Sequence, residues 1–167
     1  NSSSFPVSAK ASGQYMNSML AVQDARVRGY DEAILLNQDG NVAEGSGQNI
    51  FFVKDGKVYT NDYSASILMG ITRDSILTFL PDLELASSIV DISVDDILGA
   101  DEVFCCGTAS EITPVVEIDN QKIGSGLAGE ITLRIREYYL DIVFGRNSSY
   151  SHWLTEVSLP SQTSLQK

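Results

Sequence analysis

The pattern of apolar positions predicts a helix near the start of the chain, over residues 13–28. Four side chains recur there at near-helical spacing, namely Tyr15, Met19, Leu20 and Val27. Gly29 follows and supplies a stop signal for the helix. Residues 1–9 are polar and contain a proline, so we expect them to form a linker ahead of this helix.

Two hairpins are predicted between residues 32 and 60. Residues 32–46 read as a strand, a turn containing Asp39-Gly40 and a second strand. Residues 49–60 repeat the pattern around Asp55-Gly56, a dipeptide typical of tight hairpins. The sheet is therefore expected to be antiparallel in this region.

The rest of the chain alternates helices with strands. Residues 70–80 predict a short helix that ends near Pro81, with Ile71, Ser75, Ile76 and Phe79 along one face. The next expected elements are a strand within 85–92, a short helix capped by Ser93, a buried strand over 102–107 and a hairpin over 115–123. A final amphipathic helix is expected from about 128 to 144. Its inner face would carry Ile131, Ile135, Tyr138, Tyr139 and Ile142, and the polar residues 154–167 would form a tail.

Composition narrows the class of protein. The 167 residues, 43% of them apolar, suit one globular domain with a real core. A formal charge of −11 with scattered basic residues disfavours nucleic acid and anionic membranes as partners. No apolar stretch approaches the ~20 residues that span a bilayer, and no signal-peptide pattern opens the chain. We therefore expect a soluble, cytoplasmic protein whose chain begins within a longer polypeptide, because an initiating Met is lacking.

Few residues could serve as metal ligands or disulfide partners. With His152 as the single histidine, no metal-ligand spacing exists, and we expect no metal site. Cys105 and Cys106 are adjacent and therefore poorly placed to bridge each other, which fits a reducing compartment. They are either small residues of a buried strand or a thiol redox pair.

Five short motifs occur in an order that resembles one known active site. They are AKASGQYMNS around Lys10, VAEGSGQNIFFV, GITRD, DEVFCCGTASEITPV and a C-terminal HWL. The chain from Lys10 to Trp153 is similar to the large, C-terminal domain of the branched-chain amino acid aminotransferases, which are pyridoxal phosphate enzymes of fold type IV. This resemblance implies an α+β fold, with a mainly antiparallel pseudo-barrel sheet flanked by helices. The expected organisation is a linker (1–9), a cofactor-binding large domain (10–153) and a tail (154–167), without the N-terminal small domain.

The resemblance assigns roles at the reacting end of the cofactor to three residues. Lys10 would bond to the cofactor aldehyde and move the substrate proton, because a neutral amine adds to an aldehyde. Glu44 would keep the pyridine nitrogen protonated, and Tyr15 would donate a hydrogen bond to the phenolate oxygen. Without the other motifs, Lys10 reads as a surface lysine, Glu44 as a solvated turn acid and Tyr15 as core packing.

Phosphate and substrate binding are implied for two turns. Ile71 and Thr72 would bind phosphate at a helix start, where free amides and the helix dipole favour an anion. By resemblance Thr108 also contacts the phosphate and takes part in substrate binding, while the Ala109 amide holds the substrate carboxylate. Arg73 and Asp74 are expected either to pair on the surface or to brace the turn.

Two departures from the family pattern affect the expected substrate site. Many bacterial members read EGxGEN, whereas this chain has Gln48 in place of the second glutamate, so a charge is expected to be missing there. The small domain, which supplies an arginine for the phosphate and further groups for the substrate, is also lacking from the chain.

The sequence thus predicts an enzyme that exchanges an amino group between Leu, Ile or Val and 2-oxoglutarate, by a ping-pong cycle on pyridoxal phosphate. The expected assembly is a homodimer or larger homo-oligomer. Two alternatives remain open at this point. One is the related aminodeoxychorismate lyase or D-amino acid aminotransferase activity, and the other is a non-catalytic fragment that folds and self-associates.

Overall fold

The computed structural model describes residue 6 and residues 9–157. The chain divides into two compact units, residues 1–136 and residues 137–167, and each is described by itself. The predicted tail beyond residue 157 and most of the predicted linker lie outside the described residues.

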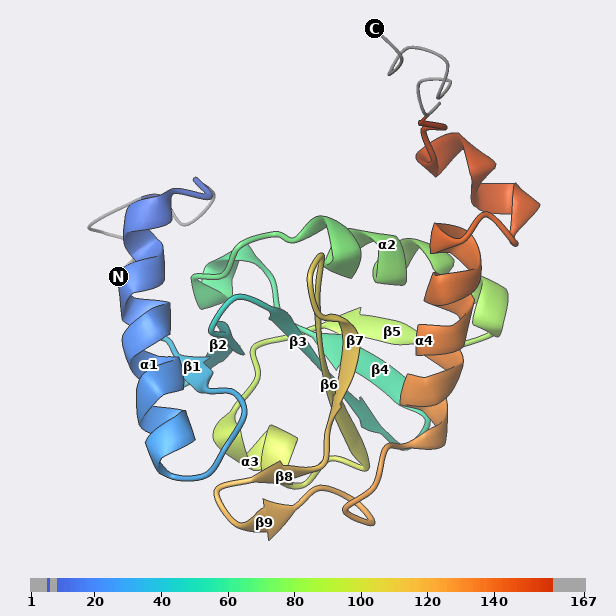
Figure 1. Ribbon diagram of the computed structural model, residues 1–167. Coiled ribbons are helices and arrows are strands. Elements are labelled where there is room, and N and C mark those ends of the chain that lie inside the picture. Colours follow the sequence, from blue (N-terminus) through green and yellow to red (C-terminus); the bar gives the residue numbers. More distant parts are fainter. Residues whose placement is uncertain (1–5, 7–8, 158–167) are drawn as a thin grey trace, which may run out of the picture. The chain divides into compact units, whose positions relative to one another are not determined.

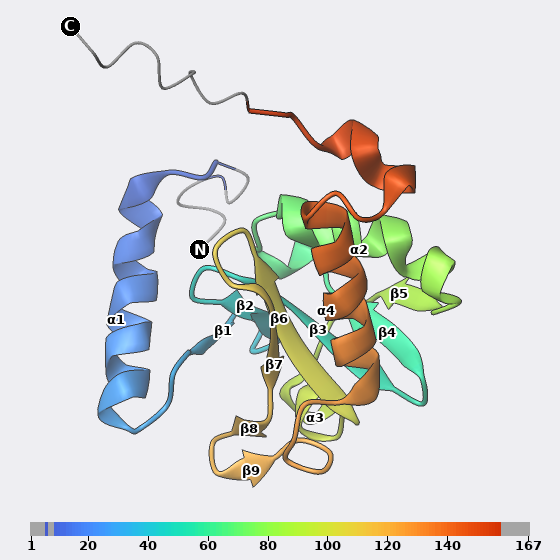
Figure 2. The same cartoon turned by 45° about the vertical axis from the view of Figure 1, so that its right-hand side comes forward.

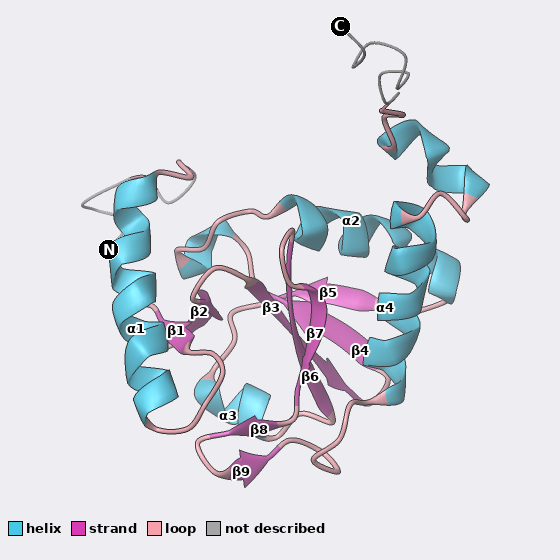
Figure 3. Ribbon diagram, viewed as in Figure 1, coloured by secondary structure: helices cyan, strands magenta, loops and turns pink. Residues whose placement is uncertain are grey.

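The described chain contains α-helices, short 3-10 helices and strands (Figure 1, Figure 3). The α-helices are α1 (Tyr15–Val27), α2 (Ile71–Phe79), α3 (Val94–Leu98) and α4 (Glu130–Val143). Short 3-10 turns span Ser12–Gln14, Tyr63–Ala65, Leu80–Leu83 and Ser148–Trp153. The strands are β1 (Ile34–Leu36), β2 (Val42–Gly45), β3 (Asn49–Lys54), β4 (Lys57–Thr60), β5 (Ser87–Ile89), β6 (Glu102–Gly107), β7 (Glu111–Val115), β8 (Glu117–Ile118) and β9 (Gln121–Lys122).

The strands of the described region form one five-stranded sheet, ordered β5-β4-β3-β6-β7, and two separate hairpins, β1-β2 and β8-β9. All pairings are antiparallel except β4 with β5, which is parallel. The α+β class and the mainly antiparallel sheet are therefore confirmed, but these strands do not close into one barrel. The sheet ends at β5 and β7, and Pro114 suits the β7 edge because it has no N–H for a further strand.

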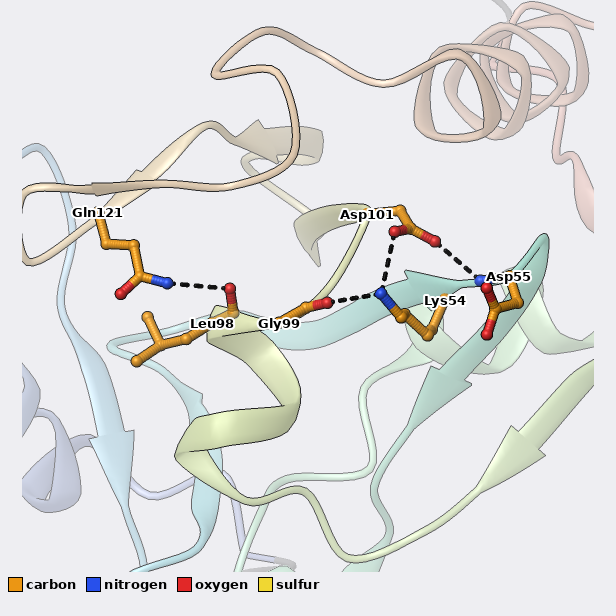
Figure 4. A network of polar contacts seen from close by, with 6 residues as sticks. All are labelled: Lys54, Asp55, Leu98, Gly99, Asp101 and Gln121. Carbon is orange, nitrogen blue, oxygen red and sulfur yellow. Dashed lines mark hydrogen bonds and ion pairs between the residues drawn. The ribbon is translucent and has the colours of Figure 1, made fainter.

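The turn between β3 and β4 confirms the predicted Asp55-Gly56 hairpin. Both residues have positive φ, 50° for Asp55 and 73° for Gly56, as a tight turn of this type requires. Asp101 braces the turn, because its carboxylate accepts from the Asp55 N–H at 2.8 Å and pairs with Lys54 at 3.2 Å (Figure 4). The same figure shows Gln121 of β9 donating to the Leu98 carbonyl at the end of α3.

The core lies on both faces of β3 and β6. On one face the rings of Phe51 and Phe104 stack with centroids 4.9 Å apart, and on the other Phe52 stacks on Tyr59 at 4.8 Å. Full burial of such side chains contributes about 1.5–3 kcal/mol each. This explains why residues 49–54 and 102–107 read as continuous apolar runs rather than as alternating strands.

Glu102 at the start of β6 fixes the beginning of α4. Its carboxylate oxygens accept from the N–H of Ile131 at 3.0 Å and of Thr132 at 2.7 Å, and from the Thr132 hydroxyl. A negative charge at a helix start is favourable because the first N–H groups there have no partner within the helix. A side chain at Gly129 would overlap the Glu102 carboxylate, so the close approach requires glycine.

The predicted helix over residues 13–28 is present as α1, but its apolar face is not core. Met19 is 67% exposed, Leu20 60% and Val27 84%, while Ala25 is buried. In both views α1 stands beside β1 (Figure 1, Figure 2). A helical repeat of apolar residues indicates which face will be covered, but not by what.

Other expectations on element limits need smaller corrections. In α2 the buried residues are Thr72, Arg73, Ile76 and Phe79, whereas Ile71 is 75% exposed. The strand expected within 85–92 is confined to β5, and β7 was not predicted because its Thr113-Pro114 pair is unusual in a strand. The predicted cap at Ser93 is confirmed, with a reciprocal capping box to Asp96.

In the second unit, aromatic rings pack around Tyr150. Its centroid lies 4.5 Å from that of Trp153, and Tyr138 meets it edge-on at 6.3 Å. No helix among the described residues is long and apolar enough to cross a membrane.

Candidate active site

A cavity of about 930 Å³ gathers the sequence-predicted site residues in the first unit. Its walls come from the start of α1, from β2, from the segment before α2 and from the end of β6. The predicted residues that line it are Lys10, Tyr15, Glu44, Ile71, Thr72 and Thr108. Ala109 is exposed and follows Thr108 directly, but it does not line this cavity.

Lys10 lines the cavity and lies ahead of the 3-10 turn that leads into α1. Its Nζ stands over the Tyr15 ring, 5.6 Å from the centroid, and both side chains are exposed. A cation over an aromatic face is held by the ring quadrupole, here in a solvent-exposed setting. Because α1 starts at Tyr15, the helix places the phenol beside the amine.

Glu44 is the acid of the site whose pKa is shifted most. Burial raises the pKa of its carboxyl from 4.5 to about 7, against the opposing effects of a hydrogen bond from Leu68 and of the Lys10 charge. Such a carboxyl is poised to ionise when a cation enters the cavity, because an opposite charge lowers its pKa again. A solvated turn acid, the alternative reading of Glu44, would show no such shift.

A closed set of polar contacts surrounds the Glu44 carboxylate. Its Oε2 accepts from the Leu68 N–H at 3.1 Å, and the Asn49 amide nitrogen donates to the Leu68 carbonyl at 2.7 Å. The same nitrogen lies 3.5 Å from Glu44 Oε2. Sequence reasoning missed Asn49 and Leu68, since neither residue type stands out in isolation.

The start of α2 offers free backbone amides to the cavity. Gly70 precedes the helix in an extended conformation and forms no side-chain cap, so the first N–H groups of α2 remain available to an anion. Thr72 is 4% exposed, and Thr108, which follows the end of β6, lines the same cavity. Residues of both predicted turns therefore line one site.

Arg73 does not pair on the surface but supports the structure as a buried side chain. Its side chain is 2% exposed, and its guanidinium donates to the Asn61 carbonyl from Nε at 3.1 Å and from one terminal nitrogen at 2.5 Å. The Asn61 amide in turn donates to the carbonyls of Val42 and Ala43, at 2.8 and 2.6 Å. This chain of bonds ties α2 to β2, the strand that carries Glu44.

Gln48 has a carboxylate as its neighbour. Its Nε2 donates to Glu32 Oε2 at 2.7 Å, and Glu32 Oε1 accepts from the Ala33 N–H at 2.8 Å. Gln48 lines the cavity without a charge of its own, and the Glu32 carboxylate that it bonds does not line the cavity. The other amide atom of Gln48, Oε1, is buried and has no partner among the described residues.

Cys105 and Cys106 are buried in β6, as expected for small residues of a buried strand. Burial raises the pKa of the Cys105 thiol to about 12 and raises that of Cys106 as well, so both thiols stay protonated at neutral pH. A protonated, inaccessible thiol is a poor nucleophile, which argues against a redox role. The described residues contain no cluster of His, Cys, Asp and Glu able to hold a metal ion.

Comparison with known proteins shows which family the chain resembles. The family described as "Amino-transferase class IV" matches residues 1–118. A probable branched-chain-amino-acid aminotransferase of Aquifex aeolicus is 49% identical over 156 residues, which are 92% of this chain and 50% of that protein. The branched-chain-amino-acid aminotransferase of Pseudomonas aeruginosa is 45% identical, and the match covers 89% of this chain and 48% of that protein.

Solved structures give the same result. The branched-chain amino acid aminotransferase of Thermobaculum terrenum, in its PLP-form, superposes with a TM-score of 0.92 at 40% identity. The match covers 95% of this chain and 52% of that one. The chain therefore belongs to the class IV aminotransferase family. Within that family it is similar to the branched-chain enzymes, and it spans about half the length of the relatives it matches.

The ionisation of Glu44 predicts how stability depends on pH. The folded pKa lies above the unfolded one, so the favourable contribution of the neutral acid is present at low pH and is lost as pH rises through about 7. Glu44→Gln removes this titration. In the chain without ligand, we expect the variant to gain stability relative to the parent between pH 5 and 8, by up to about 3 kcal/mol.

Urea unfolding at several pH values measures the difference between variant and parent. Glu117→Gln, at an exposed glutamate of β8, is the matched control and should change the free energy of unfolding by less than about 0.5 kcal/mol. A Glu44→Gln difference that does not change with pH would show that Glu44 ionises as a solvated acid.

Proposed function

We propose that this chain is the cofactor-binding domain of a branched-chain amino acid aminotransferase. The reaction is the exchange of an amino group between Leu, Ile or Val and 2-oxoglutarate on pyridoxal phosphate, by a ping-pong cycle. One observation carries the proposal. A single cavity brings an accessible amine, Lys10, together with a buried carboxyl, Glu44, and the free amides at the start of α2.

The residues present fit the cofactor at each of its functional groups. Lys10 would hold the aldehyde, and Tyr15, whose ring lies under the Lys10 amine, would donate to the phenolate oxygen. Glu44 would hold the ring nitrogen, where a bound pyridinium would restore its charge. When bound, pyridoxal phosphate supplies an electron sink for the substrate Cα.

The phosphate would lie against Ile71, Thr72 and Thr108. Ile71 and Thr72 offer main-chain amides at the helix start, and the two threonines add hydroxyl groups. Thr108 and Ala109 would also bind the substrate, with the Ala109 amide on its carboxylate. Any proton moved at the substrate Cα would pass through Lys10, because its amine is the base held nearest to the aldehyde position.

The proposal divides the chain into a linker (1–9), the large domain (10–153) and a tail (154–167). The family's small domain would complete the substrate site with groups that this chain does not carry. A cytosolic homodimer or larger homo-oligomer belongs to the same proposal. The exposed apolar side chains of α1 support association, since such patches mark contact surfaces.

Substrate profiling of a full-length polypeptide that contains this chain tests the proposal. We expect L-leucine, L-isoleucine and L-valine to donate an amino group to 2-oxoglutarate with kcat/KM at least about a hundredfold above that for D-alanine. A preference for D-alanine, or pyruvate release from aminodeoxychorismate, would identify one of the related activities instead. A full-length protein that neither binds pyridoxal phosphate nor turns over any of these substrates would support the non-catalytic alternative.

A further inference from the structure

The three residues before α2, Leu68 to Gly70, connect the two ends of the proposed cofactor site. Leu68 meets Glu44 through its N–H, at 3.1 Å, and Gly70 accepts the first helical hydrogen bond of α2 from the Asp74 N–H at 3.0 Å. A shift of this segment would therefore move the Glu44 partner and the start of the helix together.

Asn49 fixes this segment from the neighbouring strand. Its side chain is 6% exposed on β3, and its amide nitrogen donates to the Leu68 carbonyl at 2.7 Å while lying 3.5 Å from Glu44 Oε2. The position of β3 is set independently, because the Asn49 backbone pairs with Cys106 in the central sheet. Asn49 thus transfers the geometry of the rigid sheet to a segment that has no regular structure of its own.

Steric contact adds a second restraint at Gly70. A Cβ placed on Gly70 would overlap the Asn49 amide oxygen, far inside the contact distance of the two atoms. The φ of Gly70 is −71°, a value open to any residue. Glycine is therefore required here for space, because the Asn49 amide presses against the residue at which α2 begins.

We propose that Asn49 is a positioning residue that couples the Glu44 carboxylate to the anion-binding start of α2. The inference rests on the proposed function, in which Glu44 meets the cofactor ring and α2 meets its phosphate. One amide, held by the sheet, then sets the distance between the two contacts. Asparagine suits the position because its nitrogen donates to two acceptors, whereas an aspartate would bring a second negative charge against Glu44.

A purely structural role for Asn49 makes a different prediction. If its amide only satisfied the Leu68 carbonyl, its loss would cost stability but would leave ligand affinity and its dependence on pH unchanged. Thr60→Val is the matched control for that cost. Thr60 is fully buried, and its hydroxyl donates to the carbonyl of Ile50, the β3 residue next to Asn49, at 2.8 Å. The hydrogen bonds to the Glu44 carboxylate come instead from Leu68 and Asn49.

The experiment measures sulfate affinity of the chain, by amide shifts of Ile71 and Thr72 in NMR titrations at pH 5 and pH 8. Sulfate keeps its charge over this range, so changes report the protein. For Asn49→Asp we expect about tenfold weaker binding than the parent at pH 8, and most of that loss regained at pH 5. At pH 5 either Glu44 or the introduced aspartate holds a proton, and a protonated aspartate can again donate to the Leu68 carbonyl.

Three outcomes decide the matter. Weakening at pH 8 with recovery at pH 5, and no more than about a twofold change in Thr60→Val, supports the coupling. Equal affinity of Asn49→Asp and parent at both pH values overturns it, as does a parent that binds no sulfate at Ile71 and Thr72. Asn49→Ser, which is smaller and uncharged, should lose affinity equally at both pH values, so a defect of folding in the aspartate variant does not obscure the result.

Failure of this inference is separable from failure of the proposed function. Reductive attachment of pyridoxal phosphate to Lys10 in the parent tests the function and does not depend on Asn49. A parent that is labelled at Lys10 while Asn49→Asp binds sulfate normally would overturn the coupling alone.

Discussion

Replacement of Lys10 by alanine is expected to abolish transamination in a full-length polypeptide that contains this chain. We expect kcat to fall by at least about a thousandfold, because Lys10 would both bond to the cofactor aldehyde and carry the substrate proton. Borohydride reduction with pyridoxal phosphate, followed by peptide mapping, should place the label on the peptide that contains Lys10.

Lys57 provides a close control for this experiment. Its Nζ lies 5.2 Å from the centroid of the Tyr59 ring, much as Lys10 lies over Tyr15, but it does not line the cavity. Lys57→Ala should retain parental turnover and parental labelling. Labelling that persists in Lys10→Ala, or that is confined to Lys54, Lys57 or Lys122, would remove Lys10 from the proposed mechanism.

Arg73→Ala is expected to cost about 3 kcal/mol or more in the free energy of unfolding. The change removes a fully buried side chain, leaves a cavity under α2 and deprives the buried Asn61 carbonyl of its two donors. Burial lowers the pKa of the Arg73 guanidinium, and the nearby Asp62 carboxylate opposes this effect. A lysine is shorter and lacks the planar fork, so Arg73→Lys should recover only part of the loss.

Urea unfolding followed by circular dichroism measures this difference. Arg136→Ala, at an exposed arginine of α4, should change the free energy by less than about 0.5 kcal/mol. An Arg73→Ala protein as stable as Arg136→Ala would show that the bonds to Asn61 contribute nothing net to stability. Loss of sulfate binding at the start of α2 is expected to accompany the loss of stability.

The elements of the fold that could be predicted are those that depend on a few neighbouring residues. The hairpin at Asp55-Gly56 and the helix cap at Ser93 depend on two to four neighbouring residues, and both predictions are confirmed. By contrast, β7 contains a proline, and its existence depends on pairing with β6, which no local pattern reveals. The exposed face of α1 shows the same limit, since periodicity does not specify a partner surface.

For the site, the sequence motifs identified the residues with functional groups but not the residues that hold them in position. Lys10, Glu44 and Thr72 carry functional groups whose chemistry suggests a role, and the structure places them around one cavity. Asn49 acts, in our proposal, through a backbone carbonyl 19 residues away in sequence. The sequence left open whether Arg73 pairs on the surface or braces the turn, and its partner is again a main-chain oxygen. Backbone acceptors are common to every residue, so the sequence alone does not identify them.

Residues at both ends of strand β6 have fixed positions, and this limits where the chain can change in length. Glu102 at one end holds the start of α4, and Thr108 beyond the other end faces the cavity. Insertion or deletion of one residue between them would turn the strand side chains on one side of the change to the opposite face and would separate one anchor from its target. Length changes in this region should instead be tolerated at the exposed turn Asp119-Asn120, between β8 and β9, which bears on neither anchor.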